Sequence, residues 1–408
     1  MKTTRGKRPS AFNKEVISFL LSQNISLFGS SVVAFAIIWY ITLETSSGLW
    51  LMLSTICSTV PQVVISLWGG VWADRYNRKH LIMFSDGFIA LATLGLVAAF
   101  WAGLGRLELL LVASVVRSLG AGIQTPAVNA LFPQLVPTES LTRVQGINQT
   151  LSSLLMLVSP AVGGVVLGSF GLVWAFFIDV ITATLAILVM AFIKVDRVTR
   201  DESLGSVLAE LKEGITYTLS HRLLSGLLIC YACSFFLITP AAVLTPLLIE
   251  RSFGGEVWKL TANEISWTIG SLIGGLFVSW HGGFQDKIRT IAMCLVIFGV
   301  TFGFLGLATS FSVYLFIMGA AGFFMPVMAT TQTVLIQEIT SPSMMGRVFS
   351  IIQIIAAGAM PLAILVFGPL ADIVSVEVIL IVSGALLALV GVLYHRSYGP
   401  LSIEGNTP

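Results

Sequence analysis

The sequence predicts an all-helical membrane protein with about twelve transmembrane helices in two six-helix repeats and both termini in the cytoplasm. Of its 408 residues, 56% are hydrophobic and only 10% are charged, whereas a soluble domain carries about 25% charged residues. Apolar segments long enough for the roughly 20-residue helix that crosses a bilayer recur along the whole chain. The basic residues gather on one side of these segments, which indicates their orientation.

The apolar segments define the predicted spans in order. The first follows a basic N-terminus, is longer than the core of a signal peptide and has no small-residue cleavage site after it, so we interpret it as a retained span. The spans are residues 16–43, 48–73, 80–102, 107–131, 143–168, 171–195, 222–248, 260–281, 289–309, 311–336, 347–370 and 376–395.

The Lys and Arg residues support this count and give the orientation. With the N-terminus inside, all but four of the 22 Lys and Arg lie in predicted cytoplasmic segments. Of the four, Arg106, Arg251 and Lys259 fall outside the cell and Arg117 lies within a span. Such a bias is typical of a membrane protein whose basic loops stay in the cytoplasm.

One polar segment divides the spans six and six. We predict an N-terminal six-helix bundle over 1–193, a cytoplasmic linker over 194–221, and a C-terminal six-helix bundle with a short tail over 222–408. The apolar residues of the linker recur at helical spacing, which predicts an amphipathic helix along the membrane surface that acts as a tether. These residues are Leu204, Leu208, Leu211, Ile215 and Leu219.

The two halves of the chain resemble each other. "GAGIQTPAVNA" at 120–130 and "GAAGFFMPVMA" at 319–329 each place a Gly four residues before a Pro. "GGVWADR" at 69–75 has an echo in "GGLFVSW" at 274–280, where Ser279 replaces the acid. Paired six-helix repeats are typical of transporters with a substrate site between the halves near mid-membrane.

The loop "GGVWADRYNRK" at 69–79 resembles the signature loop of the major facilitator superfamily, Gly-x-x-x-Asp-Arg-x-Gly-Arg-Lys. Asn77 replaces one family Gly, and Asn also tolerates a left-handed turn. The matching residues are Gly70, Asp74, Arg75, Arg78 and Lys79.

The spacing within this loop suggests a role for two of its residues. Gly70 is expected to let its helix approach a neighbour closely. Asp74 is expected to clasp the inner start of span 347–370, accepting bonds from free N–H groups near Gly346 and pairing with Arg347. Such a clasp would close the cytoplasmic side. Arg78 and Lys79 are also explained by the positive-inside bias alone.

Two further stretches resemble family motifs. "RSLGAGIQTP", with Arg117, Gly120 and Gly122, is similar to the family's Arg-x-x-x-Gly region. "SPAVGG", with Pro160, Gly163 and Gly164, is similar to the Gly-Pro-x-x-Gly-Gly motif of exporters, with Ser159 replacing the first Gly. Ordinary packing of small residues is the alternative reading of these stretches. Over nearly the whole chain the resemblance is closest to macrolide-efflux-type drug:proton antiporters.

Ionisable residues within the spans indicate a functional or structural role, because insertion of each into the bilayer costs at least ~2.5–3.5 kcal/mol. Arg117, Asp179 and Glu264 are candidates for proton coupling. The alternative is a structural ion pair, which for Asp86 we expect with the inside Arg and Lys residues. "TANE" at 261–264 also reads as a capping box, which would place Glu264 at a helix start.

An apolar cavity with few polar anchors would suit bulky amphiphilic compounds. Aromatic, Met and small polar residues on three spans are its candidate lining, although core packing or lipid contact would explain each one singly. These residues are Asn24, Phe28, Phe235, Phe236, Phe323, Phe324 and Met325.

Together these features predict a secondary active transporter of the bacterial plasma (inner) membrane that exports hydrophobic or amphiphilic small molecules. The substrate would be a drug or antibiotic, such as a macrolide, exchanged for protons by alternating access. The alternatives are an exporter of an endogenous metabolite or siderophore, or an uptake carrier.

Other classes are disfavoured. The chain lacks the phosphate-binding loop of an ATP-driven pump, and its four scattered His form no H-E-x-x-H motif, so we expect no enzyme, metal or cofactor. Cys230 and Cys233 lie on an apolar span without a nearby His or acid and are interpreted as packing residues. The net charge of +2 is too small to indicate nucleic acid as a partner, and none is expected. The expected partners are the substrate, protons and membrane lipid, and the chain is expected to be monomeric.

Overall fold

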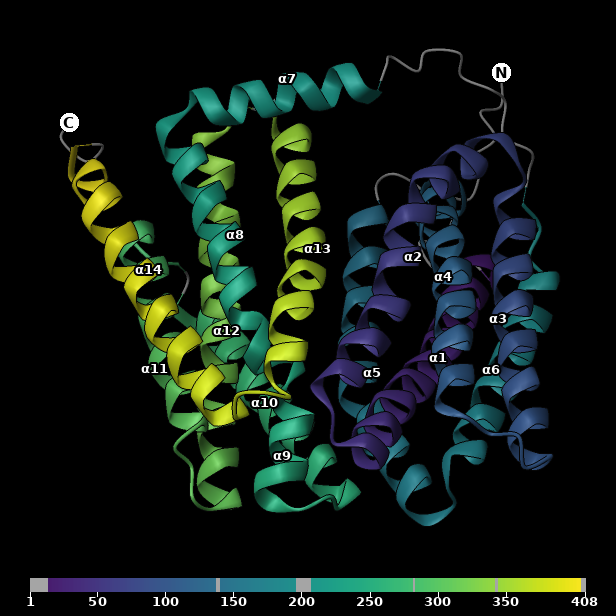
Figure 1. Ribbon diagram of the computed structural model, residues 1–408. Helices are drawn as coiled ribbons and strands as arrows, with labels where there is room; N and C mark the ends of the chain where they lie inside the picture. The colour runs from purple at the N-terminus through teal and green to yellow at the C-terminus, as the bar shows by residue number, and fades with distance from the viewer. Residues whose placement is uncertain (1–13, 137–139, 196–206, 282, 342–343, 405–408) are drawn as a thin grey trace, which may run out of the picture. The chain divides into compact units, whose positions relative to one another are not determined.

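The computed structural model describes residues 14–136, 140–195, 207–281, 283–341 and 344–404 (Figure 1). These residues are almost entirely α-helical. The helices are α1 (Lys14–Thr45), α2 (Gly48–Arg75), α3 (Arg78–Trp101), α4 (Leu107–Leu135), α5 (Leu141–Ser169), α6 (Leu172–Ala191), α7 (Val207–Ser220), α8 (Arg222–Val243), α9 (Thr245–Phe253), α10 (Val257–His281), α11 (Lys287–Leu305), α12 (Phe311–Ile339), α13 (Met345–Leu370) and α14 (Val376–Glu404).

The helical lengths confirm a protein with about twelve membrane helices. Within the described residues, 11 helical segments are long and apolar enough to span a membrane, with α8 and α9 forming one of them, Arg222–Phe253. The remaining long helix, α10, corresponds to the predicted span 260–281 but carries Lys259, Asn263 and Glu264. The all-helical prediction is therefore correct, whereas the inside location of the termini stays a prediction.

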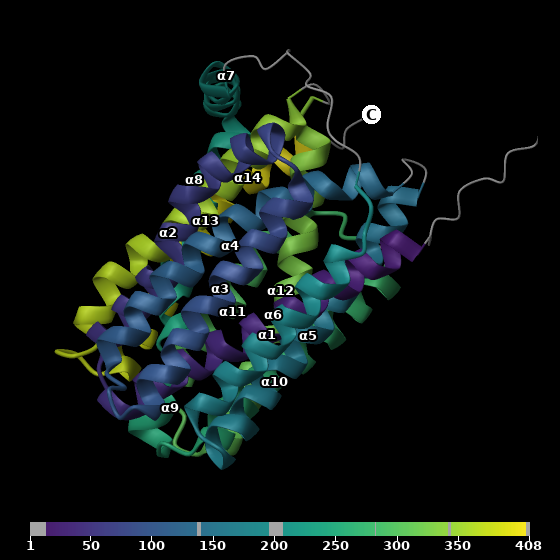
Figure 2. The same cartoon turned by 90° about the vertical axis from the view of Figure 1, so that its right-hand side faces the viewer.

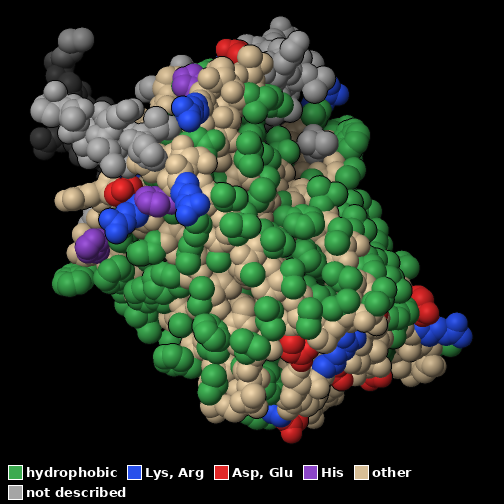
Figure 3. Space-filling view, turned by 60° about the vertical axis from the view of Figure 1, so that its left-hand side comes forward, with side chains coloured by type: hydrophobic (Ala, Val, Ile, Leu, Met, Phe, Trp, Pro, Cys, Tyr) green, Lys and Arg blue, Asp and Glu red, His purple; other side chains and the backbone are tan. Residues whose placement is uncertain are grey.

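The surface has the polarity expected of a membrane protein. On the face drawn in Figure 3, hydrophobic side chains cover the middle and charged side chains gather towards the two ends. Large apolar side chains such as Leu91, Leu276 and Phe316 are exposed by 69%, 72% and 79%. Lipid solvates such side chains as well as a protein interior does, so their exposure carries no penalty in a bilayer.

The chain forms two compact units. The first comprises Met1–Tyr40 and Ile56–Arg200, and the second comprises Ile41–Thr55 and Asp201–Pro408. The end of α1 and the beginning of α2 therefore count with the second unit. In the first unit α3 packs against α4 and α6, and in the second unit α11 packs against α12 and α14.

The same glycine contact recurs in both units. A Cβ built on Gly69 of α2 would lie 2.6 Å from the carbonyl oxygen of Gly122 in α4, and one on Gly274 of α10 would lie 2.0 Å from that of Phe323 in α12. Pro126 and Pro326 flank these contacts at 3.3 and 2.9 Å. Both helix pairs thus approach closely only because no side chain intervenes.

The prediction that Gly70 makes the close approach is wrong. A Cβ on Gly70 would have no described heavy atom within 4 Å, so its neighbour Gly69 makes the contact. Successive residues lie about 100° apart around a helix, and only one of a Gly pair can face the adjacent helix.

The amphipathic helix α7 lies across one end of the second unit. In Figure 1 it runs over the ends of α8 and α13, and in Figure 2 it is seen nearly end-on. Glu213 of α7 pairs with Arg347 of α13 at 2.9 Å, and the Tyr217 hydroxyl accepts a bond from the backbone N–H of Ser341. Ile215 and Leu219 are exposed, which fits a helix resting on a membrane surface.

We predict that Gly274→Ala destabilises the protein whereas Gly275→Ala does not. Both changes remove a helical glycine, so the gain in helix propensity is shared, but only the first places a methyl group against the Phe323 carbonyl. Overpacking of this kind costs about 1–3 kcal/mol. Thermal unfolding of the purified variants in detergent measures it, and equal midpoints would contradict the contact.

Candidate functional site

The first unit holds a buried ion pair between two of the predicted coupling residues. Arg117 of α4 and Asp179 of α6 are 9% and 0% exposed, and the guanidinium Nη1 contacts the carboxylate Oδ2. The same Nη1 also contacts the Thr93 hydroxyl of α3. A lone charge at bilayer depth is costly, so each of these two residues compensates the charge of the other.

The carboxylate of Asp179 has partners at both oxygens. Oδ1 accepts a bond from the Ser30 hydroxyl of α1 at 3.1 Å, and the Thr93 hydroxyl lies 2.8 Å from Oδ2. Together with Arg117, these contacts connect four helices of the unit. They satisfy both oxygens of a carboxylate that has no access to water.

A second buried carboxylate, Asp86 of α3, lies near this pair. Asp86 is 1% exposed, and its Oδ1 accepts bonds from the Ser26 hydroxyl at 2.6 Å and the Gln124 amide at 2.8 Å. The expected ion pair with the inside basic residues is wrong: Asp86 contacts no described Arg or Lys. Its partners are neutral because it faces the bundle interior, whereas the basic side chains point to the helix ends.

Arg78 and Lys79 serve as caps at those ends. Arg78 donates to the carbonyl oxygens of Ala73 in α2 and Ala130 in α4, at 3.0 and 3.1 Å. Lys79 Nζ donates to the carbonyls of Ala191 and Ile193 at the end of α6, at 2.7 Å each. Cations at helix C-termini satisfy free carbonyls and favour the helix dipole, so these residues do more than orient the chain.

The other residues predicted to form the clasp and its loop are Arg75, Asp74 and Arg347. Arg75 is exposed. The side chain of Asp74 is not among those described, so the proposed clasp on α13, whose first turn contains Gly346, stays a prediction. Arg347, the expected partner, pairs with Glu213 of α7 in this structure.

The acidic candidate in the second unit, Glu264, belongs to a small polar cluster. Its Oε1 accepts a bond from the Asn263 amide at 3.2 Å, and Asn263 accepts one from the Tyr314 hydroxyl of α12 at 2.8 Å. The capping-box reading is wrong, because α10 begins at Val257 and places Glu264 in its second turn. Within the described residues, no three His, Cys, Asp or Glu side chains could together hold a metal ion.

The exporter-type stretch of α5 contributes close packing. Pro160, Gly163 and Gly164 are all buried within a continuous helix. A Cβ on Gly163 would lie 3.4 Å from the carbonyl oxygen of Val32 in α1. Gly163 therefore lies where α5 meets α1, at a separation that is ordinary van der Waals contact.

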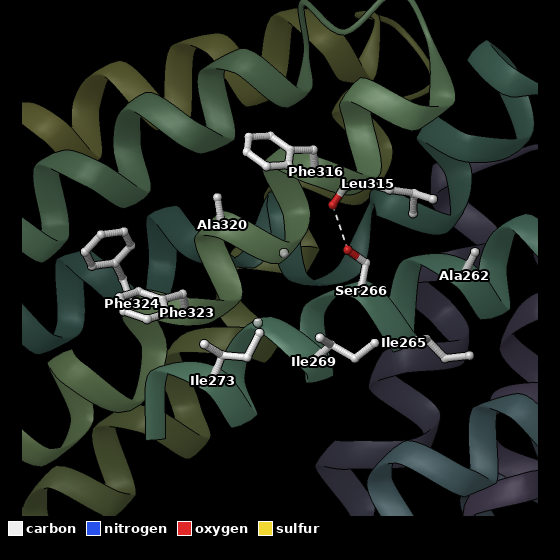
Figure 4. A pocket seen from close by; sticks show the side chains of 12 residues that line it. Ala262, Ile265, Ser266, Ile269, Ile273, Leu315, Phe316, Ala320, Phe323 and Phe324 are labelled. Carbon is white, nitrogen blue, oxygen red and sulfur yellow. Dashed lines mark hydrogen bonds between the residues drawn. The ribbon is translucent and has the colours of Figure 1, made fainter. Parts of the chain in front are cut away.

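Each unit has an apolar pocket that includes predicted cavity residues. In the first unit, α1, α5 and α6 form a pocket of about 530 Å³, and Asn24, Phe28 and Thr182 line it among aliphatic side chains. In the second unit, α10 and α12 form a pocket of about 680 Å³ (Figure 4). Its lining includes Phe323 and Phe324, and Ser266, the sole hydroxyl there, donates to the Leu315 carbonyl at 2.6 Å.

Three other cavity candidates lie outside both linings. Phe235 stacks on Tyr231 and Phe236 packs against Phe367, which are contacts within the second unit. Met325 is 39% exposed next to the second pocket. These residues stay candidates without a described pocket.

Sequence reasoning missed a polar cluster at the beginning of α2. The Asp372 carboxylate accepts bonds from the backbone N–H groups of Gly48 and Leu49, at 2.7 and 2.9 Å, and from the Ser47 hydroxyl at 2.9 Å. Arg251 pairs with it at 3.2 Å. The only sequence signal is an acid directly after a span, which gives no indication of the helix N-terminus that it caps.

Comparisons with known proteins give one family by sequence and a matching fold by structure. A family model described as Major Facilitator Superfamily matches residues 19–362. The chain is 31% identical over 375 residues to "Macrolide efflux protein A" of Streptococcus pyogenes, covering 91% of this chain and 92% of that one. It is 23% identical to "Multidrug efflux pump Tap" of Mycolicibacterium fortuitum, with 89% and 90% covered. A solved structure of a POT family transporter in complex with 5-aminolevulinic acid has a TM-score of 0.72 at 12% identity, with 97% and 98% covered.

We predict that Arg117→Ile destabilises the first unit and that adding Asp179→Ser restores most of the loss. The single change leaves a buried carboxylate unpaired, which costs about 3–5 kcal/mol, whereas removal of both charges is nearly neutral. Unfolding in mixed micelles measures both variants. A double variant no more stable than the single one would contradict the pairing.

We predict a local pH dependence at Asp372. Burial acts to raise the pKa of this carboxyl, but the bonds from Leu49, Gly48, Ser47 and Arg251 outweigh it and lower the pKa overall. A lowered folded pKa means that the cap is complete at neutral pH and is lost as the pH falls through that value.

Hydrogen exchange of the amides at the start of α2 measures this cap. At neutral pH Asp372→Asn should speed their exchange relative to the wild type, and the difference should vanish once the carboxyl is protonated. A difference that persists unchanged in acid would contradict the cap.

Proposed function

Because the chain belongs to the Major Facilitator Superfamily, we propose that it exports hydrophobic or amphiphilic small molecules, macrolides among them, in exchange for protons. It acts as a monomer in a bacterial plasma membrane and works by alternating access. The proposed substrate class is supported by the similarity to macrolide efflux protein A, which covers about nine-tenths of both chains. The family and the fold are those of membrane transporters rather than enzymes.

The buried Arg117–Asp179 pair supports ion coupling. A transporter that moves only neutral substrate downhill has no need for ionisable groups at bilayer depth, where each is costly. One proton that crosses 100 mV releases about 2.3 kcal/mol. Since about 1.4 kcal/mol corresponds to a tenfold ratio, this energy sustains a substrate gradient of roughly fifty-fold.

The two pockets support an apolar substrate. Their volumes of about 530 and 680 Å³ fall within the range of small-molecule sites, which is roughly 300–1,000 Å³. Their linings are mostly aliphatic and aromatic, and the polar side chains are Asn24 and Thr182 in the first pocket and Ser266 in the second. Such pockets accept bulky amphiphiles or lipid tails, and they offer no cation to an anionic metabolite or siderophore.

Accumulation of radiolabelled erythromycin in cells that express the chain tests this function. We predict several-fold lower accumulation than in cells with the empty vector, and loss of the difference when an uncoupler dissipates the proton gradient. Unchanged accumulation at normal expression would contradict macrolide export. Raised accumulation would instead indicate an uptake carrier, and export that survives the uncoupler would contradict proton coupling.

A further inference from the structure

We propose that Asp86 of α3 is the residue that binds and releases the transported proton. This assignment rests on the proposed proton coupling, and it gives Asp86 a different role from the ion pair beside it. Asp179 and Arg117 form the fixed charges of the site, and Asp86 changes its charge.

The surroundings of Asp86 favour its protonated form. The side chain is 1% exposed, and both of its donors, Ser26 and Gln124, bond to Oδ1. Oδ2 is buried and accepts no hydrogen bond from any described residue. A buried carboxylate oxygen without a donor or a cation is among the most costly groups in a protein, whereas a neutral carboxyl is tolerated far better.

Asp179 has the opposite surroundings, which explains why it is not the proton carrier. Its two oxygens contact Arg117, Thr93 and Ser30. Asp86 stands seven residues before Thr93, the partner of Asp179 on α3, which is about 10.5 Å along the helix at 1.5 Å per residue. These three buried groups are two carboxylates and one guanidinium, and the guanidinium contacts Asp179 alone. Their charges therefore balance when a single proton binds to Asp86.

The helices packed around α3 bring no second cation to Asp86. The ionisable side chains of α1 are Lys14 and Glu15 in its first turn and Tyr40 and Glu44 within its last six residues, and that helix presents Ser26 to Asp86. α4 contributes Glu108 in its first turn and Arg117, and α6 contributes Asp179. Of these groups only Asp179 and its partner Arg117 lie at the site.

The second repeat shows that packing does not require an acid at this position. Asn77 caps α3 and Asp286 caps α11, each accepting a bond from a backbone N–H of the first helical turn. Nine residues beyond these caps stand Asp86 and Leu295, and Leu295 is fully buried. Leucine fills the equivalent place, so the carboxyl of Asp86 serves a purpose other than filling the core.

The depth of Asp86 in the bundle indicates that a proton reaches it before it reaches the ion pair. At 1.5 Å per residue, Asp86 lies about 12 Å from the beginning of α3, and Asp179 lies about 18 Å from the end of α6. Lys79 joins these two helix ends, so both depths are measured from the same side. A proton from that side reaches Asp86 first, and the ion pair lies beyond it.

Infrared difference spectroscopy of the full-length protein in lipid tests the assignment without any substrate. A pH step from acid to alkaline should remove the carbonyl band of a buried, protonated carboxyl. We expect Asp86→Asn to lack this band and to release about one proton fewer per molecule in the same step. Asp372→Asn, a change of the same type at a partly exposed site, should retain the band. Thermal unfolding confirms that each variant is folded.

The outcomes separate this proposal from the export function. A band that persists in Asp86→Asn, or that disappears in Asp179→Asn but not in Asp86→Asn, overturns the assignment. In vesicles, Asp86→Asn should lower pH-driven accumulation of radiolabelled erythromycin at least about tenfold. If the wild type itself accumulates no erythromycin, the export function fails, and the infrared result still decides the role of Asp86.

Discussion

The ion pair between Arg117 and Asp179 is the constraint around which the first unit is arranged. Neither charge is tolerable alone in the membrane interior, so α4 and α6 must bring them together, and α1 and α3 must supply Ser30 and Thr93 to complete the carboxylate's bonds. The pair thereby fixes the relative rotation of four helices. A hydrophobic pair would pack the same space with less constraint, which suggests that the charges are retained for function.

Close helix packing depends on glycine positions that the repeats share. Gly69 and Gly274 allow a neighbouring backbone to approach to a distance that any side chain would prevent. In lipid no hydrophobic force drives helices together, so such close contacts, with their dispersion and backbone interactions, supply much of the association. The repeat seen in the sequence is therefore also a repeat of one packing device.

The sequence predicted the helices well and their mutual contacts poorly. Apolar length and basic loops are local signals, and they located the spans and singled out Arg117 and Asp179. The pairing of these residues, 62 positions apart, depends on which faces of α4 and α6 meet, and spacing does not reveal that. The Glu264 error has a similar cause: Gly254, at φ 95°, ends α9, and α10 then begins before the apparent capping box. The motif also could not show that Gly69, rather than the adjacent Gly70, makes the close contact with α4.

The two repeats differ most in buried charge, and this difference suggests a division of labour. In the first unit Arg117 lies five residues before Gly122. The residue five before Gly322 in the second unit is Ile317. Asp179 lies seven residues after the first residue of α6. The residue seven after the first residue of α14 is Ser383. Leu295 replaces Asp86 at the third position. Asp86 and Asp179, the fully buried acids among the described residues, both belong to the first unit, whereas Glu264 of the second unit lies half-buried in a neutral network with Asn263 and Tyr314. The two bundles are similar, but the fully buried charges are concentrated in the first. Under the proposed function this leaves the apolar surface of the second bundle free to vary with the shape of the substrate.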